Sequence, residues 1–276
     1  MVVFPNCKIN LGLHIVGKRK DGFHDLETVF YPLPICDALE IVRAGSEEQA
    51  AGGILFSGSG VHIDGQSDNL CIKACHLLKK DFPHLPVIRL HLHKAIPVGA
   101  GLGGGSADAA FTLRLLNSQF KLGLTHDQLL HYAAQLGSDC PFFIINQPCA
   151  ATGRGELLEP LALDLSSYKF IVVNPGIPIN TAKAFAGVTP AASPRPVKEI
   201  IQQPVESWKK ELINDFEKTV FLQYPEVSNL KKLLYDQGAL YASMSGSGST
   251  VFGIFQRDQS LSVDMPGHYF IRELIG

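Results

Sequence analysis

No stretch of the sequence approaches the roughly 18 consecutive apolar residues that a helix needs to cross a bilayer. Cysteine is also scarce: the six cysteines form neither a Cys-x-x-Cys pair nor the dense framework of a disulfide-stabilised secreted domain. The first residues lack the charged-then-apolar order of a secretory signal. These absences predict a cytoplasmic protein with reduced thiols.

The sequence also has no excess of positive charge. Lys and Arg number 24 against 26 Asp and Glu, a formal net charge of -2, so no broad field attracts nucleic acid or an anionic membrane. We therefore expect neither as a partner, and an anionic ligand must be held locally. The 276 residues are 46% hydrophobic, which predicts a folded chain of two domains or two lobes.

Strands dominate the first third. Over residues 7–15, apolar side chains at odd positions alternate with Lys8, Asn10, Gly12 and His14 at even positions, which predicts a strand with one polar face. Lys8 and Asn10 should lie on that face. A loop around Asp21-Gly22 follows, and short strands are expected over 38–44 and 53–60.

Helices and strands then mix. Helices are predicted over 69–82, from Ser106 to 120, over 124–137 behind a Thr125 cap, and over 206–222 and 226–237. Strands are predicted over 87–96, 137–144, 168–174, 250–255 and 268–272, and the proline-rich stretch 189–204 is predicted to be a loop. This order indicates an α+β fold with a boundary between 150 and 165.

Glycine gathers between a predicted strand and helix in PVGAGLGGGSADAA, residues 97–110. Backbone amides there can surround an anion, and the helix start adds free N–H groups, so the run predicts a phosphate site. It lacks the Gly-Lys-Ser/Thr ending of a Walker A loop. A flexible connection is the alternative, and Ser106 contributes a hydroxyl or caps the helix. The candidate residues are Pro97, Gly99, Gly101, Gly103, Gly104, Gly105 and Ser106.

Together with CKINLGLHIVGKRKDGFHDLET, LGSDCPFF, ATGRGE and SGSGSTVFGIF, this run resembles the GHMP kinases along nearly the whole chain. The resemblance implies a two-domain α+β kinase. Residues 1–155 would form a ribosomal-protein-S5-domain-2-like domain that carries the ATP-binding loop, and residues 156–276 a ferredoxin-like domain.

Within the family, these motifs imply that ATP phosphorylates the 2-hydroxyl of a cytidine-diphosphate-linked methylerythritol, a step of non-mevalonate isoprenoid synthesis. A mevalonate-type or homoserine-type kinase, or a catalytically silent sugar-sensing relative, is the alternative. Mg²⁺ is expected with ATP, but no carboxylate cluster assigns its ligands and no protein metal site is predicted. A monomer or weak homodimer is expected.

Two residues match the family's catalytic pair. Asp139 in GSDCP matches the aspartate that receives the proton of the attacking hydroxyl, and Lys8 in CKIN matches its partner lysine, which polarises the hydroxyl or offsets phosphate charge. An ordinary ion pair is the alternative for both.

Other residues match binding positions. Asn10 would face substrate hydroxyls, His24 the cytosine edge, and Phe23 and Phe185 its two faces, although NTAKAF around Phe185 departs from the family's proline-bearing pattern. The alternatives are a strand-edge hydrogen bond for Asn10, a solvated loop position for His24, and core packing for either phenylalanine.

Two further segments have both a binding and a structural interpretation. Asn69 matches an adenine-side contact or caps a helix. Gly246 and Gly248 in SGSGST lie near the substrate phosphates or form a plain hairpin loop.

Overall fold

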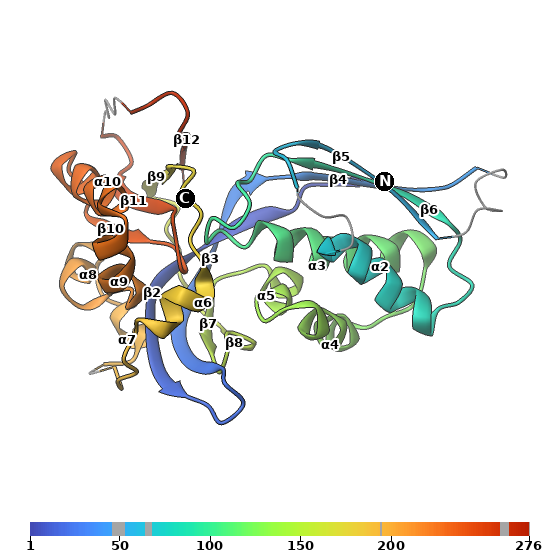
Figure 1. Cartoon of the computed structure of the whole chain (residues 1–276), viewed down its shortest axis with the longest axis horizontal. Helices are drawn as coiled ribbons and strands as arrows, with labels where there is room; N and C mark the ends of the chain where they lie inside the picture. The colour runs from blue at the N-terminus through green and yellow to red at the C-terminus, as the bar shows by residue number, and fades with distance from the viewer. Residues whose placement is uncertain (46–52, 64–67, 194, 260–264, 276) are drawn as a thin grey trace. The chain divides into compact units, whose positions relative to one another are not determined.

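The structure, a computed structural model, describes residues 1–45, 53–63, 68–193, 195–259 and 265–275 (Figure 1). The chain divides into two compact units. Unit 1 comprises Met1–Cys7, Pro34–Val98 and Gly103–Asn146, and unit 2 comprises Lys8–Leu33, Gly99–Leu102 and Gln147–Gly276. Both units draw on the N-terminal third of the chain, and the predicted boundary at residue 155 stays a prediction.

Unit 1 contains a four-stranded sheet in the order β1-β4-β6-β5. The strands are β1 (Val2–Val3), β4 (Ala38–Arg43), β5 (Ile54–Gly60) and β6 (Ile88–Lys94). Strand β6 is antiparallel to β4 and parallel to β5, and the parallel pair requires the crossover that helix α2 (Leu70–Asp81) supplies. Leu90 and Leu92 are buried while Arg89 is exposed, as the alternation of this segment predicts.

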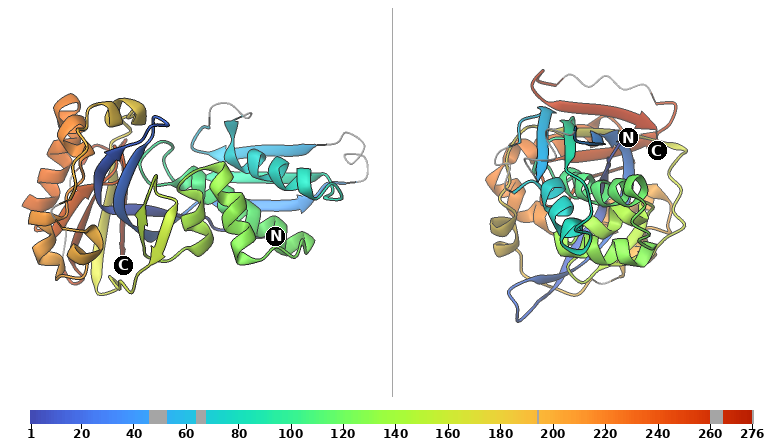
Figure 2. Two further views of the ribbon diagram at one scale, coloured as in Figure 1. Left: turned by 90° about the horizontal axis from the view of Figure 1, so that it is seen from below. Right: turned by 90° about the vertical axis from the view of Figure 1, so that its right-hand side faces the viewer.

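Four helices of unit 1 lie together on one face of this sheet (Figures 1 and 2). They are α2, α3 (Gly104–Phe120), α4 (His126–Leu136) and α5 (Cys140–Ile145). Helix α3 buries small side chains, including Ala107 and Ala110 at 0% exposure, which lets it pack closely against its neighbours. The helix that carries the end of the glycine run is therefore fixed by core packing.

The C-terminal sheet of unit 2 has the order β10-β11-β9-β12, with every neighbouring pair antiparallel. A second sheet, β2-β3-β7-β8, combines two strands from the start of the chain with two strands from just past its middle. The strands of the two sheets are β2 (Asn6–Lys18), β3 (His24–Cys36), β7 (Cys149–Thr152), β8 (Leu157–Pro160), β9 (Tyr168–Asn174), β10 (Tyr241–Met244), β11 (Val251–Gln256) and β12 (Phe270–Ile275).

Helices and sheet of unit 2 share a buried apolar core. The helices are α6 (Thr181–Ala186), α7 (Val197–Ile200), α8 (Val205–Glu211), α9 (Phe216–Gln223) and α10 (Pro225–Asp236). Phe216 and Val220 of α9, Leu234 of α10 and Val251 and Phe255 of β11 belong to one cluster of side chains that are nearly all inaccessible to solvent. This cluster also contains Leu13 and Ile15 of β2, which anchors the strand that bears Lys8.

Two predicted elements were wrong in type or extent. Residues 137–144 were predicted to form a strand, but residues 140–145 form the helix α5. A proline in its first turn favours a helix start, and short apolar runs do not distinguish strand from helix. The single helix predicted over 206–222 is two helices, α8 and α9. Between them the Asn214 side chain accepts a hydrogen bond from the N–H of Phe216, the first residue of α9.

Other differences concern residues predicted to be loop. Strand β3 begins at His24, inside the predicted loop, and the short α7 lies within the proline-rich stretch 189–204. The last strand runs over 270–275 rather than 268–272, and α3 starts at Gly104 rather than Ser106. The sequence around these bounds is typical of turns, because pairing with distant segments decides where these elements begin and end.

The cap predicted at Thr125 is confirmed as a complete capping box, with Thr125 and Gln128 each bonding the other's backbone N–H. We expect Thr125→Ala to lower the free energy of unfolding by about 1 kcal/mol, because an exposed helix start loses its side-chain acceptor. Urea denaturation measures this change. Thr125→Ser keeps the acceptor and should stay near wild type; equal destabilisation by both variants would contradict the capping role.

Candidate active site

Lys8 and Asn10 lie on the same face of β2, as the alternation predicts. The Lys8 Nζ donates a hydrogen bond to Asn10 Oδ1 at 2.5 Å, and the ammonium lies 4.6 Å from the centroid of the Phe30 ring. Both polar side chains are buried, at 3% and 2% exposure. A buried ammonium needs compensation, and the amide oxygen and the ring face both offer negative charge density.

Within unit 2, hydrogen bonds through residues 245–250 connect this strand to the first part of the glycine run, residues 99–102. Asn10 N donates to Ser245 Oγ at 3.2 Å, and Ser245 Oγ donates to Gly101 O at 2.8 Å. Thr250 N donates to Ala100 O at 3.2 Å. Residues 99–102 and 245–250, far apart in sequence, are therefore held together by hydrogen bonds beside the Lys8 strand.

Only glycine fits at position 101. Its φ is +79°, and a Cβ there would lie 2.0 Å from the Ser245 carbonyl oxygen. Gly99 also has a positive φ, +65°, but a Cβ there would meet no atom within 4 Å. The glycine at 101 therefore serves a close backbone approach, and the glycine at 99 leaves open space.

The SGSGST segment forms a tight, buried turn between β10 and β11. Asn214 Nδ2 donates to both Met244 O and Gly246 O at 2.8 Å, and Gly246 and Gly248 have φ values of +55° and +93°. A Cβ at Gly246 would lie 3.4 Å from Asn10 Oδ1. The turn is thus built against the Lys8–Asn10 pair, while its proximity to substrate phosphates stays a prediction.

The second part of the glycine run starts α3 in unit 1. Gly103 is the N-cap, with φ +70° and no side-chain cap, so the N–H groups of the first turn and the helix dipole suit an anion. A Cβ at Gly104 would lie 2.9 Å from Lys94 Nζ. Ser106 is the third residue of the helix and does not cap it; Gly105 is exposed and Pro97 half-buried.

Sequence reasoning missed a buried charge cluster beneath this turn. Lys94 Nζ donates to Asp37 Oδ2 and, at 2.9 Å, to Asp108 Oδ2, and Asp37 Oδ1 accepts from Ala95 N and Ile96 N. The three charged side chains are buried. Desolvation, together with the neighbouring Asp37 carboxyl, raises the pKa of Asp108 to about 7 against the attraction of Lys94. The sequence held one indication of this cluster, the single aspartate within the alanine-rich ADAA.

Asp139 and Asn69 both lie at helix starts of unit 1. Asp139 is the N-cap residue of α5, and its pairing with Lys8 of unit 2 stays a prediction. Asn69 caps α2 by accepting from Cys71 N at 2.8 Å, which confirms the capping interpretation. Its contact with adenine also stays a prediction.

The structure brings His24 and Phe185 together in unit 2. Their rings stack with centroids 4.9 Å apart at an interplanar angle of 18°, and Phe185 packs edge-on against Phe216. Phe23 is 54% exposed, and the guanidinium of Arg154, a residue that sequence reasoning missed in ATGRGE, lies 5.0 Å from its ring centroid. The cytosine sandwich of Phe23 and Phe185 stays a prediction.

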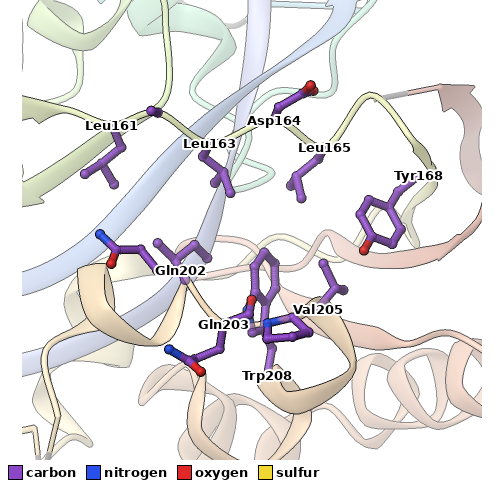
Figure 3. Close-up of a pocket in the computed structure, with 12 residues that line it drawn as sticks. Leu161, Leu163, Asp164, Leu165, Tyr168, Gln202, Gln203, Val205 and Trp208 are labelled. Carbon is purple, nitrogen blue, oxygen red and sulfur yellow. The ribbon is translucent and has the colours of Figure 1, made fainter.

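A pocket of about 400 Å³ lies elsewhere in unit 2 (Figure 3). Leucine side chains of 161–165 face Val205 and Trp208 across it, with Gln202 and Gln203 at its edge. None of the predicted site residues lines this pocket, and Asp164 is its only charged lining residue, so it offers no catalytic arrangement.

The described residues contain no group of three or more His, Cys, Asp or Glu side chains that would hold a metal ion. Cys71 and Cys75 are buried in the packed face of α2, and burial raises the pKa of Cys75 to about 12, so it is an inert thiol. In the part of the chain that the structure describes, no helix is long and apolar enough to span a membrane.

Two family models match the chain: GHMP kinases N terminal domain over residues 69–153 and GHMP kinases C terminal over residues 197–262. Together they cover more than half of it. The chain belongs to the GHMP kinase family. The predicted resemblance is thereby confirmed, and so is the α+β architecture expected of a GHMP kinase.

Individual GHMP kinases are similar over nearly the whole length. A protein of Bacteroides fragilis named 4-diphosphocytidyl-2-C-methyl-D-erythritol kinase is 49% identical over 263 residues, which is 95% of this chain and 94% of the relative. A crystal structure of 4-(cytidine 5'-diphospho)-2C-methyl-D-erythritol kinase has a TM-score of 0.78 and 32% identity, covering 92% and 90% of the two chains.

Methanococcus jannaschii mevalonate kinase has a TM-score of 0.68 at 12% identity, covering 94% of this chain and 92% of its own. At that identity the likeness supports the fold alone.

Asp108→Asn tests the proton held by the buried cluster of this GHMP kinase. Because burial raises the pKa of Asp108, the folded chain keeps a proton between about pH 4 and pH 7, where the unfolded chain has already released it. This contribution to stability is complete below that window and is lost as the pH rises through it. Within that window, the free energy of unfolding of the wild type should fall, relative to that of the variant, by on the order of 1 kcal/mol for each unit that the pH rises.

Urea unfolding between pH 4.5 and 8 measures this difference, and the exposed Asp236→Asn is the matched control. Parallel pH profiles of the wild type and Asp108→Asn would contradict the raised pKa.

Gly101→Ala should destabilise the protein by more than about 2 kcal/mol, because the methyl group collides with a backbone oxygen in addition to the strain of a positive φ. Gly99→Ala suffers only the strain, about 1 kcal/mol. Thermal unfolding of both variants measures the difference. Equal losses would show that residue 101 does not approach Ser245 as described.

Proposed function

We propose that the chain transfers the γ-phosphoryl group of ATP to the 2-hydroxyl of 4-diphosphocytidyl-2-C-methyl-D-erythritol, a step of the non-mevalonate isoprenoid pathway. The observation that carries this proposal is the 49% identity, over 95% of the chain, to a relative that bears the name of that kinase. The buried Lys8–Asn10 pair beside the glycine run supports it, since a catalytic lysine requires a fixed position.

ATP would be bound by the two parts of the glycine run. The first turn of α3, at Gly103 to Ser106, offers backbone N–H groups to phosphate oxygens, and the open space at Gly99 leaves room for the nucleotide. Asn69 would lie on the adenine side. Mg²⁺ would accompany ATP and offset part of the phosphate charge.

The acceptor would be bound by unit 2. His24 would contact the cytosine edge and Phe23 and Phe185 its faces, and the Gly246–Gly248 turn would lie near the diphosphate. In the present arrangement His24 occupies one face of Phe185, so a base that stacks there displaces the histidine ring.

The chemistry would depend on Asp139 and Lys8. The 2-hydroxyl oxygen forms a bond to the γ-phosphorus, the bond from that phosphorus to the bridging oxygen breaks, and ADP leaves. The hydroxyl proton passes to Asp139. Lys8 offsets the charge that develops on the transferred group, from a position that Asn10 fixes.

The remaining features of the proposal are organisational. We propose domains over 1–155 and 156–276, a cytoplasmic location, and a monomer or weak homodimer that binds neither nucleic acid nor membrane.

Asp139→Asn should lower kcat by about 100- to 10,000-fold, because the amide cannot accept the hydroxyl proton. ADP release from Mg-ATP and the cytidine substrate, with phosphorus NMR of the product, measures this loss. Asp81→Asn, also in unit 1, is the control and should keep wild-type turnover. A wild type that phosphorylates mevalonate or homoserine instead would overturn the substrate assignment.

A further inference from the structure

Thr28 lies on β3 next to the Lys8 strand and takes no part in the proposed chemistry. Its side chain is 1% exposed, and its strand also pairs with β7 through Ala151. Thr28 Oγ1 accepts a hydrogen bond from Asn10 Nδ2 at 3.1 Å and donates one to Gly12 O. The hydroxyl therefore connects two even-numbered residues of β2.

The donor and acceptor roles along these hydrogen bonds are fixed from one end to the other. The Gly12 carbonyl can only accept, so it takes the hydroxyl proton of Thr28 and leaves the lone pairs of Oγ1 toward Asn10. The Asn10 amide must then present its NH₂ group to Thr28 and its oxygen to Lys8. A flipped amide would set its NH₂ group against the Lys8 ammonium, where two donors meet and no bond forms.

The backbone of Asn10 is fixed independently. Its N–H donates to Ser245 Oγ, which in turn donates to Gly101 O, so the main chain is held by the Gly/Ser turn and the side chain by Thr28. All of these residues belong to unit 2. Thr28 is thus the part of the network that sets which end of the Asn10 amide faces Lys8.

We propose that Thr28 is a positioning residue for phosphoryl transfer: its hydroxyl orients the Asn10 amide, which holds the Lys8 ammonium in place. The inference rests on the proposed function for its kinetic consequence. Its structural part, the orientation of Asn10, is independent of the substrate.

Thr28→Val removes the hydroxyl at nearly constant volume. We expect kcat to fall about 10- to 100-fold, because Lys8 loses its fixed position, while KM for ATP changes less than about twofold. Thr28→Ser keeps the hydroxyl and should restore most of kcat. The matched control is Thr112→Val, because Thr112 is 0% exposed, lies on α3 of unit 1, and likewise donates to a backbone carbonyl, Asp108 O at 2.7 Å. It should keep kcat within about twofold.

A second measurement does not depend on activity. Solvent exchange of the Asn10 side-chain NH₂ protons, assigned by their loss in Asn10→Ser, should be slow in the wild type and in Thr28→Ser and at least about tenfold faster in Thr28→Val. Thermal unfolding of each variant confirms that it is folded under the assay conditions.

The inference is overturned if Thr28→Val keeps wild-type kcat, if Thr28→Ser is equally impaired, if Thr112→Val loses as much, or if Asn10 exchange does not change. If the exchange rates of the wild type and the Thr28 variants differ as expected but the wild type does not phosphorylate the cytidine compound, the orientation of Asn10 is supported and the proposed substrate is overturned instead.

Discussion

Burial of the Lys8 ammonium constrains the architecture around it. A cation with 3% exposure needs protein groups in place of water, and Asn10 of β2 offers an acceptor while Phe30 of β3 offers an aromatic face. The polar face of the strand therefore lies against other chain segments. The core residues Leu13 and Ile15 anchor the same strand, so the position of the charge depends on the packing of unit 2.

Glycine makes the close approaches that this burial requires. Gly101 lets the first part of the glycine run contact the carbonyl of Ser245, and Gly104 leaves room for the Lys94 ammonium beneath the start of α3. In unit 1 a second buried lysine, Lys94, is compensated by the carboxyls of Asp37 and Asp108. One of these two carboxyls, Asp108, holds a proton more tightly than an exposed aspartate does.

The sequence predicted those parts of the fold that depend on local periodicity. The alternation in β2 and β6, the Thr125 cap and the helix after Asn69 follow from spacing and capping chemistry. The start of β3 and the break between α8 and α9 depend on distant partners, so they were missed. For the site, the alternation indicated the common face of Lys8 and Asn10, but Thr28 and the Asp37–Lys94–Asp108 cluster emerge only when separate segments fold together.

The contact of Gly101 with Ser245 has a consequence for recombination within the family. The two residues are 144 positions apart, yet each limits what the other's segment can be, because the serine hydroxyl and the glycine backbone share one hydrogen bond. A crossover at any point between these positions places the glycine and the serine in segments of different origin, so both parents must supply residues that fit this close contact.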